Sequence, residues 1–214
     1  MDSVRTNELE TCLLNNLSNE LIEKIHLFID DQDALNRLNE ISNNSNKIVV
    51  IEIGKRPIYN DFFKYIIDNI KDKICMITNA DIYLYEYNLP LIEKLTNDKI
   101  MYALSRYEHD MSKNLIDNYC GSHDCYIFNS KFINDKIMNE HTIFAQNING
   151  IETHIIKTFC DSGFTVFNPC FQIKIVHLHQ SELRGNNYGW IGLHIFGDPN
   201  HFKNSCWCVP PIIL

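Results

Sequence analysis

The sequence lacks the features that mark membrane and secreted proteins. No stretch reaches the roughly 18 consecutive apolar residues that a membrane-spanning helix needs. The first residues, MDSVRTNELE, contain neither the basic nor the apolar region of a secretion signal. We therefore expect a cytoplasmic protein without a transmembrane segment. A chain of 214 residues with 45% hydrophobic content is long and apolar enough to bury a core.

An excess of basic charge is also missing. The chain has 27 acidic and 19 basic side chains, which gives a formal net charge of -8. Proteins that bind nucleic acids usually present a basic surface, so we expect no nucleic-acid partner. A small ligand that carries phosphate is still compatible with this charge, because a few placed cations or a metal ion can bind it against the overall field.

Paired cysteines are missing too. The eight cysteines include no CxxC pair, the spacing that zinc ribbons and redox-active pairs use. Cys75 lies inside an apolar run. We expect reduced and mostly buried thiols, as is usual in a cytosolic protein.

The sequence does contain an alternation of apolar strands and amphipathic helices. Apolar runs predict strands at residues 24–30, 47–54, 74–84, 99–105, 124–130, 164–169 and 171–179. Helical periodicity predicts helices at residues 7–18, 33–41, 90–98 and 152–163, and about four helical turns after Pro57. Several strands are apolar at every position, which is typical of parallel strands covered on both faces. The predicted fold is α/β, with a mixed, mostly parallel sheet flanked by helices in a single domain over residues 1–214.

Cations follow the predicted strand at 47–54. In open α/β sheets, ligands bind beyond the carboxyl ends of the strands, so the groups at these ends are the first candidates for a site. Gly54-Lys55-Arg56-Pro57 places two cations there, which suit a phosphate or an acidic nucleotide edge. For this motif taken alone, a solvated turn is the better explanation.

A polar break interrupts the apolar stretch ICMITNADIYL at residues 74–84. The break is Thr78-Asn79-Ala80-Asp81, and because side chains alternate along a strand, we expect Asn79 and Asp81 to point to the same side. A carboxylate there can hold Mg²⁺ or Mn²⁺, which neutralises a diphosphate, and Asn79 would assist as a neutral oxygen donor. An ordinary polar turn is the alternative.

Three further motifs carry charged groups near strand or helix ends. In Ser105-Arg106-Tyr107-Glu108, Arg106 suits a phosphate or a sugar hydroxyl, or else a surface ion pair. In Gly121-Ser122-His123-Asp124, Asp124 could accept hydrogen bonds from hydroxyl groups, although a plain turn explains the glycine and serine equally well. Glu152 opens a predicted helix, where it either complements the helix dipole or acts as a general base.

Two histidines end the last predicted strand. His177 and His179 are two positions apart, so their imidazoles lie on one side of the strand. Such a pair suits a borderline metal, whereas a lone histidine is usually structural.

Taken in order, these motifs resemble a known family. The segments that carry the resemblance are GKRPIYNDFF (54–63), ITNADIYL (77–84), ALSRYE (103–108), GSHDCYIF (121–128), VFNP (166–169) and VHLHQSELR (176–184). Over about residues 5–184 they resemble GT-A-type glycosyltransferases. Within this family they resemble the N-terminal glycosyltransferase domain of a large chlorella-virus protein and its relatives in giant viruses and microbes. The resemblance implies a Rossmann-like fold, a nucleotide-diphosphate-sugar donor and Mn²⁺ or Mg²⁺, with host cytoplasm as the location if the chain is viral. The 214 residues would then be one such domain, either by itself or as one domain of a longer polypeptide.

The resemblance also implies roles for individual residues. The family's short acidic metal motif, commonly D-x-D, has Asn79 in place of its first Asp here, so Asp81 would be the direct carboxylate ligand and His177 or His179 a further one. Glu152 matches the carboxylate base of inverting members, with Asp124 as the second candidate. The implied donor-binding residues are Arg5, Thr6, Lys55, Arg56, Thr78, Asn79, Arg106 and Ser122.

The expected reaction is the transfer of a hexose or 6-deoxyhexose from a UDP-sugar to a glycan or glycoprotein acceptor. One alternative is a catalytically degenerate module that binds a nucleotide sugar or a glycan, since Asn79 departs from the family motif. Another is a metal-dependent phosphohydrolase built on Asp81 and the two histidines, although such enzymes usually gather several more Asp and His residues into a two-metal site.

Overall fold

The computed structural model describes residues 3–41, 45–119, 122–146, 148, 150–181 and 209–214. Its α-helices are α1 Ser3–Ser18, α2 Gln32–Ile41, α3 Tyr59–Asn69, α4 Leu89–Lys94, α5 Asn114–Asp117 and α6 Ile151–Asp161. Its strands are β1 Ile25–Ile29, β2 Ile48–Glu52, β3 Ile74–Thr78, β4 Ile82–Glu86, β5 Ile100–Leu104, β6 Tyr107–Glu108, β7 Cys125–Asn129, β8 Thr165–Phe167 and β9 Lys174–His177. Two short 3₁₀ helices, Ser130–Phe132 and Asp135–Ile137, follow β7. Among the described residues, no helix is both long and apolar enough to cross a membrane.

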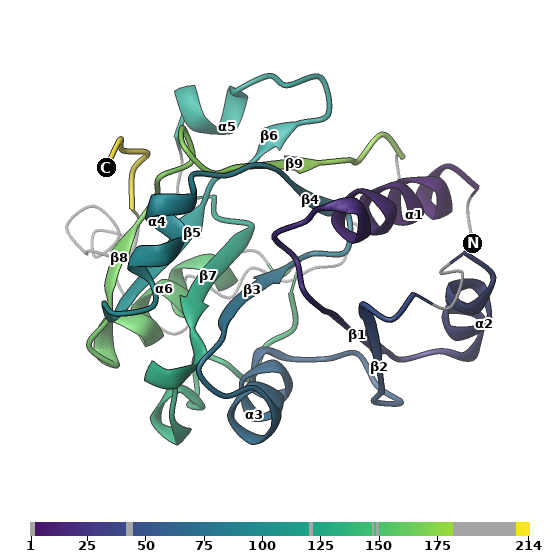
Figure 1. Cartoon of the computed structure of the whole chain (residues 1–214), viewed down its shortest axis with the longest axis horizontal. Helices are drawn as coiled ribbons and strands as arrows, with labels where there is room; N and C mark the ends of the chain where they lie inside the picture. Colours follow the sequence, from purple (N-terminus) through teal and green to yellow (C-terminus); the bar gives the residue numbers. More distant parts are fainter. Residues whose placement is uncertain (1–2, 42–44, 120–121, 147, 149, 182–208) are drawn as a thin grey trace.

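The strands form three small sheets, which confirms a mixed α/β fold (Figure 1). The largest has the order β3-β7-β5-β8, and β7 runs antiparallel to both of its neighbours. A second sheet has the order β4-β9-β6, and the third is the parallel pair β1-β2. The prediction of a mostly parallel sheet is therefore wrong, because three of the six strand pairings are antiparallel.

Burial on both faces, not parallel pairing, explains the continuously apolar strands. In β5, Met101 and Ala103 face one core, while Tyr102 and Leu104 face another. All five residues of β7 are buried for the same reason. An antiparallel strand that is covered on both sides needs the same composition as a parallel one, so composition alone could not distinguish the two.

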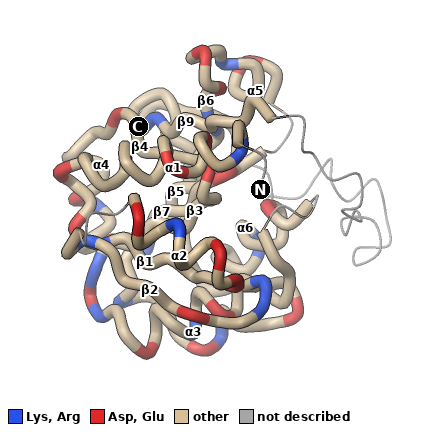
Figure 2. Tube along the Cα trace, turned by 90° about the vertical axis from the view of Figure 1, so that its right-hand side faces the viewer, with Lys and Arg blue, Asp and Glu red and all other residues tan. Residues whose placement is uncertain are grey.

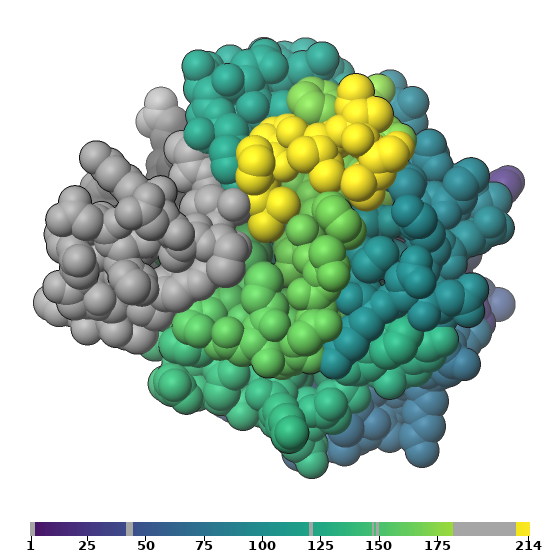
Figure 3. Space-filling view, turned by 90° about the vertical axis from the view of Figure 1, so that its left-hand side faces the viewer, coloured from purple at the N-terminus to yellow at the C-terminus, as the bar shows by residue number. Residues whose placement is uncertain are grey.

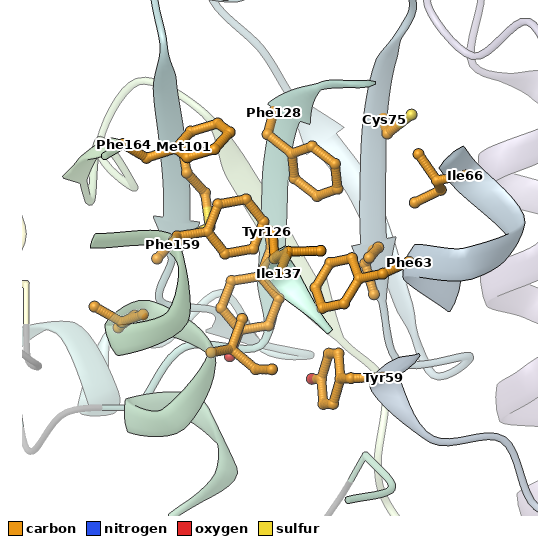
Figure 4. Packing of buried hydrophobic residues seen from close by; sticks show 14 of the residues in the cluster. Tyr59, Phe63, Ile66, Cys75, Met101, Tyr126, Phe128, Ile137, Phe159 and Phe164 are labelled. Carbon is orange, nitrogen blue, oxygen red and sulfur yellow. The ribbon is translucent and has the colours of Figure 1, made fainter. Parts of the chain in front are cut away.

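Helices α3 and α6 cover one face of the largest sheet, and α4 helps to cover the other. Figure 4 shows the aromatic centre of the first core, where Phe63 from α3 and Phe159 from α6 approach Phe128 of β7. The ring centroids of Phe128 and Phe159 are 5.0 Å apart. The pair β1-β2 joins this body through α3, since Phe28 of β1 makes an edge contact with Phe62 at 4.8 Å.

Several predicted boundaries needed correction. The stretch 74–84 forms two strands, β3 and β4, that belong to different sheets, with a turn between them. The helix after Pro57 is α3, whose 11 residues make about three turns instead of four. The helix predicted at 152–163 is α6, which ends at Asp161, and Gly163 follows it with a φ of 83°.

The two ends of the described chain lie against the sheets. Helix α1 runs beside β4, and Asn16 on this helix donates its side-chain amide to the carbonyl of Ile82 at 2.9 Å (Figure 1). At the other end, residues 209–214 lie across the segment that follows β8 (Figure 3). The backbone N–H of Ile212 donates to the carbonyl of Asn168 at 3.0 Å. The prediction of reduced, buried thiols is confirmed for Cys12, Cys75, Cys125 and Cys170, whereas Cys120, Cys206 and Cys208 lie outside the described residues.

Candidate functional site

The predicted metal set is brought together where the turn before β4 meets the end of β9. Ile82 is opposite His177 in the ladder, and the N–H of Leu178 donates to the carbonyl of Asp81 at 2.9 Å. One potential ligand atom from each of Asp81, His177 and His179 lies within 4.8 Å of the others. The two imidazoles stack with centroids 5.3 Å apart and planes 9° apart, as expected for residues on one side of a strand.

Asn79 and Asp81 do not share a strand face, so that part of the sequence interpretation is wrong. Strand β3 ends at Thr78, and the N–H of Ile82 bonds the carbonyl of Asn79 at 3.2 Å, which closes a turn. The turn buries Asp81, 5% exposed, and leaves Asn79 half-buried. A strand alternation therefore cannot place the two side chains, and only Asp81 joins the histidines.

The Asp81 carboxylate is ionised and held by two partners. Its Oδ2 lies 3.2 Å from Nε2 of His177 and accepts a 2.8 Å hydrogen bond from Nη2 of Arg5. Burial opposes ionisation, but the hydrogen bond and charge of His177 and the Arg5 guanidinium outweigh it, so the pKa of Asp81 falls well below its usual range.

Arg5 reaches this site from the first turn of α1. Its Nη1 lies 3.0 Å from Nδ1 of His179 and 3.0 Å from Glu8 Oε2, while its Nη2 bonds Asp81. Arg5 therefore engages two of the three predicted metal ligands directly. Its predicted partner was the nucleotide-sugar donor, and the contacts seen are with protein side chains. Thr6, the neighbouring residue in that prediction, lies half-buried on the same helix.

Glu8 joins α1 to the segment after β9. Its Oε1 accepts from the backbone N–H groups of Gln180 and Ser181, the second at 2.7 Å, and its Oε2 accepts from the Ser181 hydroxyl at 3.0 Å. Burial favours the neutral acid, yet these hydrogen bonds and Arg5 lower the pKa of Glu8 to about 2. Glu8 thus holds α1, and Arg5 with it, against the histidine pair.

The chemistry of the cluster fits a divalent cation. Within the described part of the chain, Asp81 Oδ1 and His179 Nε2 are buried and have no hydrogen-bond partner, which is costly unless another group binds them. A carboxylate with two imidazoles suits Mn²⁺ and its neighbours in the transition series. Arg5 is a competitor, since its N–H groups occupy Asp81 Oδ2 and His179 Nδ1.

A second group of predicted residues gathers around Asp124. Nη1 of Arg106 donates to Asp124 Oδ1 at 2.6 Å, and the Ser122 hydroxyl donates to Oδ2 at 3.1 Å. The Thr78 hydroxyl donates to the backbone carbonyl of Asp124 at 3.1 Å. Both carboxylate oxygens of Asp124 therefore have partners, so Asp124 is better suited to position Arg106 than to act as a general base.

Glu152 is the better candidate for a base. It lies in the first turn of α6, and burial, followed by the negative charge of Asp124, raises its pKa to about 7, although Arg106 and backbone hydrogen bonds oppose the rise. The negative charge of Glu152 also helps to raise the pKa values of the buried Tyr59 and Tyr126 hydroxyls, so Glu152 lies near these two tyrosines. A carboxyl that titrates near neutrality has the balance that a general base requires.

Glu108 connects the two groups and was missed in the sequence interpretation. Its Oε1 lies 3.4 Å from Nε of Arg106, and its Oε2 lies 3.5 Å from Nδ1 of His177. The signal was visible in the motif ALSRYE, where an acidic residue follows Arg106 by two positions. A continuous polar chain consequently runs from Glu8 to Asp124.

The cations after β2 have other partners. Gly54 turns the chain with a φ of 64°, after which Nζ of Lys55 bonds Asp61 at 3.0 Å and Nη2 of Arg56 bonds the carbonyl of Gln146 at 2.9 Å. Acidic and basic residues are interspersed on the face shown in Figure 2. A phosphate on this side would thus meet individual cations and not a broad basic surface.

An open hollow of about 440 Å³ lies beside Gly54, at the carboxyl ends of β1 and β2. Its lining includes Asp30, Asp31, Gln32, Leu35 and Glu52. The sequence interpretation assigned these residues no role. The carboxyl ends of two adjacent parallel strands are where open α/β sheets bind ligands.

Comparison with protein-family models and with curated proteins finds no match for this chain.

Proposed function

We propose that this protein is a GT-A-type glycosyltransferase. In this proposal it moves a hexose or 6-deoxyhexose from a UDP-sugar to a hydroxyl group of a glycan or glycoprotein, with the help of Mn²⁺ or Mg²⁺. The observation that carries the proposal is the convergence of Asp81, His177 and His179, whose ligand atoms lie within 4.8 Å of one another. Glu152 also supports the proposal, because its pKa is raised to about 7 and it lies near Asp124 and Arg106.

The residues divide the chemistry by charge. The acceptor oxygen attacks the anomeric carbon, the bond from that carbon to the diphosphate oxygen breaks, and the electron pair leaves with UDP. Glu152 takes the proton of the acceptor hydroxyl as the new bond forms. Lys55 and Arg56 follow β2 and now bond Asp61 and the carbonyl of Gln146. On leaving these partners, the two cations can interact with the departing diphosphate.

Asp81, His177 and His179 would hold the metal ion, and the ion would supply positive charge for the diphosphate. The hollow at the ends of β1 and β2 supports a nucleoside position, because its carboxylates Asp30, Asp31 and Glu52 can accept hydrogen bonds from ribose hydroxyls.

Titration calorimetry with UDP, GDP and several UDP-sugars, with and without Mn²⁺, tests this function. We expect Mn²⁺-dependent binding of a uridine nucleotide by the wild type and its loss in Asp81→Asn. The matched control is Asp68→Asn, which removes an exposed carboxylate paired with Lys64 on α3 and should change nothing. A folded wild type that binds none of these nucleotides would overturn the proposal.

A second candidate is a binding module without turnover, and one observation favours it. Arg5 already donates to Asp81 and lies against His179, so the cluster has an internal cation. Nucleotide binding that ignores Mn²⁺, with no release of UDP in the presence of glycans, would identify this second function.

A further inference from the structure

The side chain of Glu108 is placed by the backbone against one of the proposed metal ligands. Strand β6 pairs with β9 in parallel, and the register sets Glu108 opposite His177. Strand β4 pairs with the other edge of β9 and sets Ile82, directly after Asp81, opposite the same histidine. His177 is thus the middle residue of a three-strand row with a carboxylate on each side.

The two ring nitrogens of His177 face these two carboxylates. Nε2 lies 3.2 Å from Asp81 Oδ2, and Nδ1 lies 3.5 Å from Glu108 Oε2. The other oxygen of Glu108 accepts a hydrogen bond from Nε of Arg106 at 3.4 Å, which leaves Oε2 facing His177. Nδ1 of His177 makes no hydrogen bond to the described residues, so Glu108 is a carboxylate placed to accept one from it after a small movement, and such a bond would hold the imidazole in one orientation and one tautomer.

We propose that Glu108 is a positioning residue of the metal site: when a cation takes the place of the Nε2 proton that His177 shares with Asp81, Glu108 accepts the proton that His177 then carries on Nδ1 and so orients the ring toward the cation. The inference rests on the proposed function, because it assumes that Asp81 and His177 bind a metal. Through Arg106, the same side chain also ties the metal site to Asp124, the neighbour that helps to raise the pKa of Glu152.

The fold does not depend on this side chain. Glu108 holds the turn after β6 through its backbone: its N–H donates to Ser112 at 3.2 Å, and its carbonyl accepts from Met111 at 2.8 Å. Replacement by alanine retains both bonds. Its side chain is also about one quarter exposed, so truncation leaves no closed cavity.

Mn²⁺ affinity of the whole chain, measured by electron paramagnetic resonance, tests the proposal without an activity assay. We expect Glu108→Ala to weaken Mn²⁺ binding about 10- to 100-fold, the range typical of lost outer-shell partners, and Glu108→Gln to weaken it less because it retains an acceptor. Glu86→Ala is the matched control: Glu86 pairs with Lys174 across the other end of the same β4–β9 ladder, and its loss should not change the affinity.

A histidine ¹H–¹⁵N spectrum of the Zn²⁺-loaded protein gives a second readout, with His177 assigned from a His177→Gln variant. We expect an Nδ1–H tautomer in the wild type and a mixture in Glu108→Ala, a change that a merely structural role would not produce. Equal Mn²⁺ affinities with an unchanged tautomer would overturn the role of Glu108 and leave the proposed function standing. A wild type that binds neither ion would overturn both.

Discussion

Replacing Glu152 by glutamine should stabilise the protein at alkaline pH while it removes the proposed base. Burial and the charge of Asp124 raise the pKa of Glu152 from 4.5 to about 7, so the folded state keeps a proton that the unfolded state has lost between these values. A proton bound only by the folded state makes the free energy of unfolding fall by about 1.36 kcal/mol per pH unit as the pH rises through this window. The contribution of this group is therefore complete below pH 4.5 and is lost by the time the pH passes about 7.

The magnitude follows from these two pKa values. Between pH 5.5 and pH 8 the wild type should lose about 2 kcal/mol of stability through Glu152 alone, and the glutamine variant should lose none of it. Because the carboxylate is partly exposed, solvent screening makes this an upper value. For a chain of this size, about 2 kcal/mol corresponds to a shift of about 4–8 °C in melting temperature.

The assay compares thermal or urea unfolding of wild type and Glu152→Gln at both pH values. The change in unfolding free energy between the two pH values is taken for each protein, and subtracting one change from the other isolates Glu152, because the other titrating groups are common to both proteins. Glu93→Gln, an exposed carboxylate on α4, is the control and should show no pH-dependent gain. Transferase activity of the wild type should rise through about pH 7, as Glu152 loses its proton, and should be nearly absent in the variant. A Glu152→Gln protein that is destabilised equally at both pH values would refute the reasoning.

Three further predictions follow from the same contacts. Arg5→Met should strengthen Mn²⁺ binding by about tenfold, since it frees Asp81 and His179 from a competing cation. The control Arg37→Met, on α2, should leave the affinity unchanged, and weaker Mn²⁺ binding by Arg5→Met would show that Arg5 assists the metal. Glu8→Gln should lower the free energy of unfolding in urea by about 2–3 kcal/mol at pH 7, because the folded protein lowers the pKa of Glu8 from 4.5 to about 2. This stabilisation is present above pH 4.5 and is lost as the pH falls towards 2, so a cost that stays constant on acidification would contradict it. Phe159→Ala should cost about 3–5 kcal/mol at any pH, because the fully buried ring fills the core between α6 and β7; a cost below about 1 kcal/mol would mean that the core refills.

Asp81, His177 and His179 could be singled out from the sequence because their signals are local. Asp81 interrupts an apolar run, and His177 and His179 share a strand face by simple alternation. Asp81 and the two histidines come together because the start of β4 lies beside the end of β9, as the register of Ile82 with His177 shows. The alternation argument failed for Asn79 because a turn, not a strand, connects β3 to β4.

The partners of this set could not be predicted in the same way. Arg5 and Glu8 come from α1, and Glu8 bonds residues 172 and 173 positions away in the chain. Glu108 meets His177 only because β9 lies between β4 and β6, and no periodicity encodes the order of strands in a sheet. Strand direction escaped prediction for a related reason: β7 is buried on both faces, and its composition is the same whichever way it runs.

Charge explains why these separate elements form one site. Along the chain of contacts from Glu8 to Asp124, four carboxylates (Glu8, Asp81, Glu108 and Asp124) meet two guanidiniums (Arg5 and Arg106). The carboxylates outnumber the guanidiniums by two in a largely buried region, which is unfavourable unless further positive charge joins them. One divalent ion has the required charge, and Asp81 Oδ1 is the buried oxygen without a described partner. If the proposed function is correct, this region should repel an anionic diphosphate until the ion is bound, and we expect the metal to bind before, or together with, the nucleotide sugar.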